Sequence, residues 1–158
     1  MRAFWRPAPA RAALQPAGVL LASAGQPFTD AAIDEAVRLA RSQDPDASRV
    51  RVMTVARIHG TSFGLQHPGL MPNKQEKDAA QAIVARAIRS LQRAGLKADG
   101  EVAITRSPAK SFTRAARSAG ATHLVLDRPP RGPLADLDAK ATAGYLRFRL
   151  RDVTLALV

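Results

Sequence analysis

Short continuous apolar runs alternate along this chain with longer stretches in which every third or fourth residue is apolar. The runs are typical of strands buried on both faces of a sheet. Five of them stand out: GVLLAS at 18–23, RVRVMTVARI at 49–58, GEVAIT at 100–105, THLVL at 122–126 and VTLALV at 153–158. The stretches between them have the period of amphipathic helices, so the pattern predicts the order β-α-β-α-β-α-β-α-β.

Four helices are predicted between the strands, each with a recognisable start or stop. Thr29 or Asp30 caps the first, Gly95 ends the second at 74–94, Pro108 begins the third before Gly120, and the fourth covers 136–146. The residues predicted to face the sheet are Ile33, Ala36, Val37 and Ala40 in the first helix, Ala80, Val84, Ala87, Ile88 and Leu91 in the second, and Phe112, Ala115, Ala116 and Ala119 in the third.

Strands alternating with helices predict a doubly wound, Rossmann-like α/β fold: a five-stranded, mostly parallel sheet with helices on both faces. In such folds a ligand binds at the carboxyl ends of the strands. Residues 1–17 combine arginines and prolines without acidic residues or sustained periodicity, which predicts a flexible basic tail. Phe4 and Trp5 could anchor this tail on the domain. We therefore expect the tail at 1–17 and a single domain at 18–158.

The composition excludes several classes of functional site. The chain has no Cys, which excludes thiolate metal sites and a Cys nucleophile and fits a cytoplasmic protein. No apolar stretch approaches the ~20 residues that span a bilayer. The net charge is +11, with basic stripes such as Lys110, Arg114 and Arg117. A sequence-blind nucleic-acid binder is therefore one hypothesis, although no aromatic platform for stacking bases is apparent and nucleic acid is not the favoured partner.

Two segments resemble the universal stress protein family. LLASAGQPFTDAAIDEAVRLA at 20–40 has the layout of the family's first strand and Ala-rich helix. AGATHLVLDRPPRGPLADL at 119–137 resembles the stretch that precedes the family's glycine-rich loop. The resemblance covers residues 18–158 and implies the adenine nucleotide alpha hydrolase-like fold, a role in stress response, and, in ATP-binding members, a G-x₂-G-x₉-G-[ST] motif after the fourth strand.

The motif residues mostly do not carry over. Asp127, Pro130, Lys140 and Ala141 stand where the motif has Gly, Gly, Gly and Ser or Thr, and Ser23 replaces the acidic residue that ends the family's first strand. Prolines lack the N–H groups that hold phosphates, and a carboxylate repels them. We therefore expect a degenerate nucleotide site and no cofactor.

The alternative is a nucleotide site that binds phosphate through side chains and not through backbone N–H groups. Arg128, Arg131 and Lys140 could attract the phosphates of ATP or AMP by their side chains alone, with Ser23 and Gly132 beside them. These five residues are the candidates for an anion or nucleotide site.

No catalytic or metal-binding residue is predicted. Ser23 lies in LASAG, which resembles a nucleophile elbow, but Leu21 occupies a position where the elbow needs glycine. His59 and His67 lie in a long Gly-containing loop that could act as a lid. No acidic residue nearby completes a set of metal ligands with them, and His123 opens a strand. We expect the protein not to be an enzyme.

The last apolar strand is the best indication of a partner. An edge strand without Pro or charge pairs with another chain unless another segment covers it. The resemblance implies the same, because members of the family often dimerise through their final strand. The alternative is that the N-terminal tail covers this edge. The predicted interface is Val153, Thr154, Leu155, Ala156, Leu157 and Val158, with Arg147, Arg149 and Arg151 beside it.

Together these features predict a non-catalytic, dimeric stress-response or regulatory interaction protein that does not bind ATP in the family's manner. A divergent nucleotide-binding member and a sequence-blind nucleic-acid binder are the alternatives.

Overall fold

The computed structural model of the chain describes residues 16–45, 48–58, 71–128 and 133–158, and for 133–137 it describes only the backbone. The elements are β1 (Val19–Ser23), α1 (Asp30–Arg41), β2 (Val50–Arg57), α2 (Lys74–Arg93), β3 (Ala98–Thr105), α3 (Pro108–Ala119), β4 (His123–Asp127), α4 (Pro133–Arg149) and β5 (Thr154–Leu157). The strands form one sheet in the order β3-β2-β1-β4-β5, and every neighbouring pair is parallel. The predicted fold class is confirmed, with a sheet that is parallel throughout.

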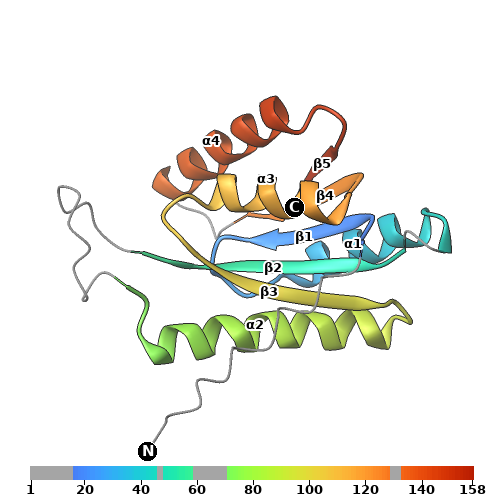
Figure 1. Cartoon of the computed structure of the whole chain (residues 1–158), viewed down its shortest axis with the longest axis horizontal. Coiled ribbons are helices and arrows are strands. Elements are labelled where there is room, and N and C mark those ends of the chain that lie inside the picture. Colours follow the sequence, from blue (N-terminus) through green and yellow to red (C-terminus); the bar gives the residue numbers. More distant parts are fainter. Residues whose placement is uncertain (1–15, 46–47, 59–70, 129–132) are drawn as a thin grey trace, which may run out of the picture.

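Helices cover both faces of the sheet, as Figure 1 shows: α3 and α4 lie on one side and α2 on the other. Successive residues of each strand point to opposite faces, so the inner strands must be apolar on both. In β1, Leu20 and Ala22 pack with α3 and α4, whereas Val19 and Leu21 pack with α1 and α2. This two-sided burial explains why the strands read as continuous apolar runs.

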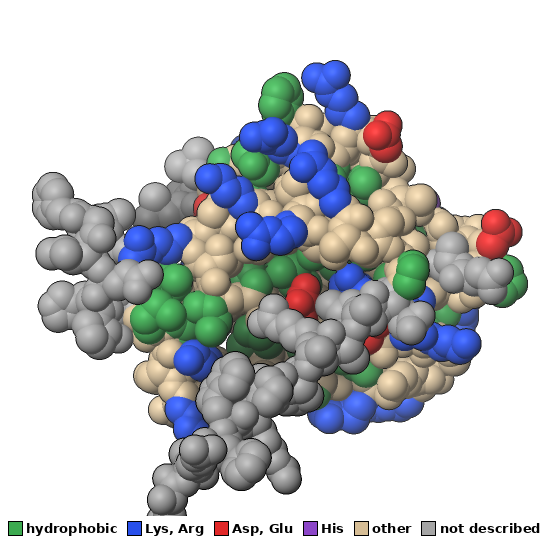
Figure 2. All heavy atoms as spheres, viewed as in Figure 1, with side chains coloured by type: hydrophobic (Ala, Val, Ile, Leu, Met, Phe, Trp, Pro, Cys, Tyr) green, Lys and Arg blue, Asp and Glu red, His purple; other side chains and the backbone are tan. Residues whose placement is uncertain are grey.

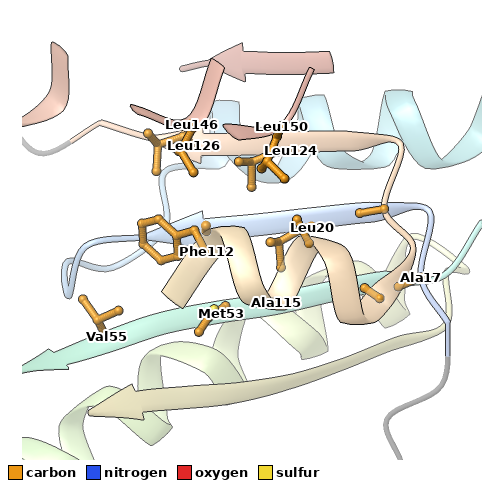
Figure 3. Close-up of a cluster of buried hydrophobic side chains, with 14 residues drawn as sticks. Ala17, Leu20, Met53, Val55, Phe112, Ala115, Leu124, Leu126, Leu146 and Leu150 are labelled. Carbon is orange, nitrogen blue, oxygen red and sulfur yellow. The ribbon is translucent and has the colours of Figure 1, made fainter. Parts of the chain in front are cut away.

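The face under α3 and α4 is organised around Phe112 (Figure 3). Its ring is fully buried in a cluster that includes Leu20 and Met53, while Leu146 and Leu150 close the cluster from the α4 side. Alanines line the rest of α3, so the helix can approach the sheet closely. On this face of the sheet the described core thus consists of aliphatic side chains, Met53 and one phenylalanine.

The predicted helix ends are those observed for the first three helices. Thr29 is the N-cap of α1, and its hydroxyl accepts a hydrogen bond from the Ala32 N–H. Asn73 and Glu76 form a reciprocal capping box at the start of α2. Gly120 ends α3 with a φ of 65°, a left-handed conformation that glycine adopts without strain.

Several boundaries differ from the prediction. Helix α4 extends beyond the expected 136–146 at both ends, because Pro133 fits a first helical turn and Arg147 and Arg149 continue the helix. Strand β3 begins at Ala98, two residues before the apolar run. The expected tail ends sooner, since Ala17 is buried in the core and donates its N–H to the Ala119 carbonyl. Residues 1–15, which hold Phe4 and Trp5, lie outside the described part of the chain.

The inward face of α1 is also rotated from the prediction. Ala32 and Leu39 are buried together with Ala36 and Ala40, while Ile33 and Val37 are only half-buried at the edge of the helix. Small residues face the sheet because the helix lies close to it. None of the helices described here is long and apolar enough to cross a membrane.

Candidate functional site

The sheet has its switch point between β1 and β4. From β1 the chain builds outward to β2 and β3, and then returns to place β4 and β5 on the other side. The connection after β1 leads to α1 on one face, and the connection after β4 leads to α4 on the other. In parallel α/β sheets this divergence leaves a crevice at the carboxyl ends of the two strands, where ligands bind.

Three polar residues meet at this point because the strands are in register. Ser23 at the end of β1 is paired across the sheet with Thr54 of β2 and with Asp127 of β4. All three are buried, Asp127 with 1% of its surface exposed. Buried polar groups need hydrogen-bond partners, so the connections of these side chains decide what the crevice can do.

The loop after β1 supplies those partners. The Asp127 carboxylate accepts hydrogen bonds from the Thr29 N–H at 2.7 Å and from the Thr29 hydroxyl at 3.2 Å. The Gln26 side-chain amide donates to the Asp127 backbone carbonyl at 3.0 Å. We call Ser23, Gln26, Thr29, Thr54 and Asp127 the Asp127 cluster. It ties the β1–α1 loop to β4 across the switch point.

Burial raises the pKa of the Asp127 carboxyl, and the two hydrogen bonds from Thr29 lower it by less. Removing the ionised carboxylate from water therefore costs free energy, and the hydrogen bonds from Thr29 offset this cost only in part. A carboxyl group in this position stabilises the capped start of α1, and it gives the mouth of β4 an acceptor rather than the donors that phosphate requires.

The Ser23 hydroxyl is occupied within the same cluster. It donates to the Gln26 carbonyl at 2.9 Å and lies 2.8 Å from the Thr54 hydroxyl. The Thr54 hydroxyl also lies 3.4 Å from the Ser23 backbone carbonyl, to which it can donate. Ser23 thus has the geometry of a buried turn residue, and it is fully enclosed.

The candidate anion residues do not meet at one described place. Arg128 follows β4 and bonds to the end of β5, with its backbone N–H 2.8 Å and its Nε 3.4 Å from the Val158 carbonyl. Lys140 is exposed on α4. Arg131 and Gly132 lie outside the described residues, as does Pro130 in the loop after β4.

A hollow of about 310 Å³ lies beside the cluster, between the β1–α1 loop, the end of β2 and the first turns of α2. Its apolar lining includes Val55, Ala80 and Ile83. Gly25 forms part of the wall with a φ of 106°, and a Cβ there would lie 3.0 Å from the Val55 carbonyl. The volume is at the lower end of the range found for small-ligand pockets.

An ion pair spans the same edge of the sheet. Arg57 ends β2 and contacts Asp138 of α4 at 2.7 Å, and Arg57 also lines the hollow. The two residues are 81 positions apart in the chain. Neither residue has a role predicted from the sequence, since no local pattern connects the end of a strand with a distant helix.

Of the three histidines, the structure describes only His123. His123 opens β4 at the amino end of the sheet, away from the crevice, and its Nδ1 lies 2.9 Å from the Gln43 side-chain amide and 3.0 Å from the Thr122 hydroxyl. His59 and His67, with the expected lid, lie outside the described residues. Within the described ranges no three His, Cys, Asp or Glu side chains come together in a metal-binding arrangement.

Several solved structures share this architecture. A protein of the universal stress protein family from Burkholderia pseudomallei matches with a TM-score of 0.59 and 18% identity over 89% of this chain and 95% of that one. The chain has the universal stress protein fold. A universal stress protein from Archaeoglobus fulgidus, in complex with dAMP, matches with a TM-score of 0.57 and 12% identity over 92% of this chain and 98% of that one.

Another protein with the universal stress protein fold, in complex with cAMP, has a TM-score of 0.57 and 14% identity, covering 91% of this chain and 96% of that one. No family model and no curated protein matches the sequence. What the chain shares with these structures is the fold, so the chemistry of its crevice must be argued from its own residues.

The two halves of the expected phosphate motif fall at distinct places in this universal stress protein fold. Asp127 is the last residue of β4, and its side chain belongs to the Asp127 cluster. Lys140 and Ala141 lie well inside α4, which begins at Pro133. Backbone N–H groups at these interior positions bond within the helix, whereas phosphate sites use the free N–H groups of the first turn.

Proposed function

We propose that this protein is a non-catalytic, dimeric regulatory protein with a universal stress protein fold, which acts by association and does not hold ATP in the manner of the glycine-rich members. The observation that carries this proposal is the Asp127 cluster. The polar groups at the switch point of the sheet are bonded to one another, with Asp127 and Ser23 buried.

A bound triphosphate would have to compete with these internal contacts. Entry of phosphate near β4 would place its negative charge beside the Asp127 carboxylate, and like charges repel strongly where water is excluded. Opening the cluster would also remove the Thr29 bonds that hold the start of α1. The proposal follows because both effects oppose nucleotide binding at the usual position.

Association through β5 is the second part of the proposal. Thr154 and Val158 donate their backbone N–H groups to β4, to the carbonyls of Thr122 and Leu126. In a parallel ladder the alternate residues, Leu155 and Leu157, direct their backbone groups to the opposite edge. Such an edge supports pairing with a second copy, and a role in stress response would then depend on which proteins recognise the dimer.

Native mass spectrometry of gently purified protein, followed by calorimetric titration with ATP and with AMP, tests this proposal. We expect a dimer without a co-purified nucleotide, and no heat of binding at nucleotide concentrations up to roughly millimolar. A dissociation constant of about 1 mM corresponds to a binding free energy of only about 4 kcal/mol. A tightly bound nucleotide, or a monomer at all concentrations, would overturn it.

A divergent nucleotide-binding protein is the second candidate, and one observation favours it. The hollow beside Gly25 is mainly apolar, with Arg57 and Glu76 in its lining, and it is large enough to receive a planar ring; two universal stress protein structures are complexes with dAMP and cAMP. In this alternative the ring enters the hollow, and Arg128, Arg131 or Lys140 attracts the phosphate.

Paired substitutions distinguish the two candidates. If nucleotide binds, Ala80→Leu in the wall of the hollow and Lys140→Ala on α4 should each weaken it at least fivefold, about 1 kcal/mol. Asp34→Ala, on the exposed side of α1, is the control and should leave the affinity unchanged. Equal effects of all three would contradict binding at the hollow.

A further inference from the structure

A groove between α3 and α4 concentrates positive charge on one side of the molecule. It encloses about 570 Å³ and is lined by Lys110, Arg114 and Arg117 from α3 and by Tyr145 and Arg149 from α4. We call these five residues the α3–α4 groove. Among the described residues that line it none is acidic. Figure 2 shows basic side chains gathered over α3 and α4 in the upper part of the view.

The four cations lie at the surface, and Arg117 also donates one hydrogen bond to the Arg149 carbonyl at 3.0 Å. Lys110, Arg114, Arg117 and Arg149 are all exposed. The α3 cations recur at steps of four and three residues, so they form one row about 10 Å long on the helix surface. That row is longer than a single phosphate group and favours an extended anion.

Aromatic side chains accompany the cations on α4. The Arg149 guanidinium lies 5.6 Å from the centre of the Tyr145 ring, and the Arg151 guanidinium lies 5.7 Å from that of Phe148. Phe148 is three residues from Tyr145 and therefore its neighbour on the helix surface. Its side chain is 66% exposed, an unusual position for a phenylalanine.

We propose that the α3–α4 groove, together with Phe148, binds single-stranded nucleic acid without sequence preference. The cations contact successive phosphates, and the exposed Phe148 ring, the half-buried Tyr145 ring and the guanidinium planes receive unstacked bases. This combination of a basic track with aromatic faces is what sequence-blind single-strand binding requires. The sequence pattern contained the basic row, but only folding brings α4 and its aromatic residues beside that row.

The proposal does not depend on the crevice at β1 and β4 or on the free edge of β5. The groove lies on the outer surface of α3 and α4, whereas the Asp127 cluster lies at the carboxyl ends of the strands. Failure of nucleotide binding or of dimerisation would therefore leave it standing.

Fluorescence anisotropy with labelled oligouridylate and oligothymidylate of about 12 nucleotides, within the site sizes known for single-strand binders, tests the proposal on the full chain. Lys110→Gln combined with Arg114→Gln should weaken binding at least tenfold at low salt. The same double substitution should reduce the slope of log affinity against log salt by about 1.4, since each cation contributes about 0.7 on single strands.

The matched control is Arg89→Gln combined with Lys97→Gln. Arg89 lies on α2, Lys97 follows it, both are exposed, and the change in net charge is the same. We expect this control to keep the wild-type salt slope and affinity within about twofold. Equal losses in the two double variants would attribute binding to net charge alone and overturn the proposal.

Phe148→Ala tests the stacking contribution. It should lower affinity about fivefold or more with an unchanged salt slope, because base stacking on an aromatic ring contributes to affinity without neutralising charge. Sedimentation of the variant separates this from a role in dimerisation. A loss of affinity that merely follows dissociation of a dimer would contradict stacking, as would duplex DNA or pyrophosphate binding as tightly as the single strand.

Discussion

Asp127 concentrates the chemistry of the crevice in one side chain. Its carboxylate joins the end of β4 to Thr29, the capping residue of α1. Burial nevertheless disfavours its ionised form, which raises its pKa. The folded protein therefore holds the proton of this group more strongly than the unfolded chain does. A pH dependence of stability follows from that difference.

Asp127→Asn should remove this pH dependence with little change in shape. In the wild type, the contribution of Asp127 to the unfolding free energy is complete below the ordinary pKa and declines as pH rises through the raised pKa. The unfolding free energy of the wild type, relative to that of Asp127→Asn, should thus fall as the pH rises from about 4, the ordinary pKa of an aspartate, through the raised pKa. Urea titrations over this range measure it.

Asp34→Asn serves as the control, because Asp34 is exposed on α1. Its difference from the wild type should not follow the same course. If instead the wild type gained stability over Asp127→Asn with rising pH, the Thr29 hydrogen bonds would outweigh burial and the sign of the pKa shift would be wrong.

Helix α2 packs closely against β2 and β3, and Gly100 permits this distance. A Cβ at Gly100 would lie 2.6 Å from Cγ1 of Val84 and 2.7 Å from the Val52 carbonyl. The first contact involves a buried side chain and the second a strand backbone, so neither can yield easily. The close packing of α2 on the sheet thus depends on the absence of a side chain at Gly100.

Gly100→Ala should destabilise the protein by about 1–3 kcal/mol, the usual cost of overpacking a core. The matched control is Gly144→Ala in α4, where a Cβ would meet nothing within 4 Å. There the same substitution should stabilise by up to about 1 kcal/mol, because alanine favours the helix. Thermal and urea unfolding compare the two, and equal effects would contradict the packing described for α2.

At the scale of the whole molecule, we expect the oligomeric state to depend on the free edge of β5. The strand pairs with β4 on one side, and its side chains alternate between the two cores: Leu155 and Leu157 pack toward α3 and α4, Ala156 and Val158 toward α1 and α2. The unpaired backbone groups are therefore what a second copy would recognise.

Leu155→Pro should produce a folded monomer. Proline removes the outward N–H of residue 155, yet it is tolerated at a sheet edge. Leu155→Val is the control, since it trims the same side chain but keeps the N–H. Sedimentation velocity should find a dimer for the wild type and for Leu155→Val. A dimer of Leu155→Pro would show that pairing does not use this edge.

The sequence alone determined the element order, the parallel sheet and most helix ends. These depend on local signals: the two-sided burial of strands such as β1, the capping hydroxyl of Thr29 and the left-handed Gly120. Helix α4 was predicted too short: its periodicity is weak, so the pattern marks no sharp stop, and the observed helix runs from Pro133 to Arg149.

Only the tertiary structure decided how distant polar groups combine. The contact of Asp127 with Thr29 joins residues 98 positions apart, and the ion pair of Arg57 with Asp138 joins residues 81 apart. Neither can be read from local spacing, which carries no information on which loop approaches which strand end. The same holds for the α3–α4 groove, since its charge row lies on α3 and its aromatic residues on α4. Local pattern fixes elements through backbone and burial preferences, whereas sites arise from the packing of elements that the chain separates.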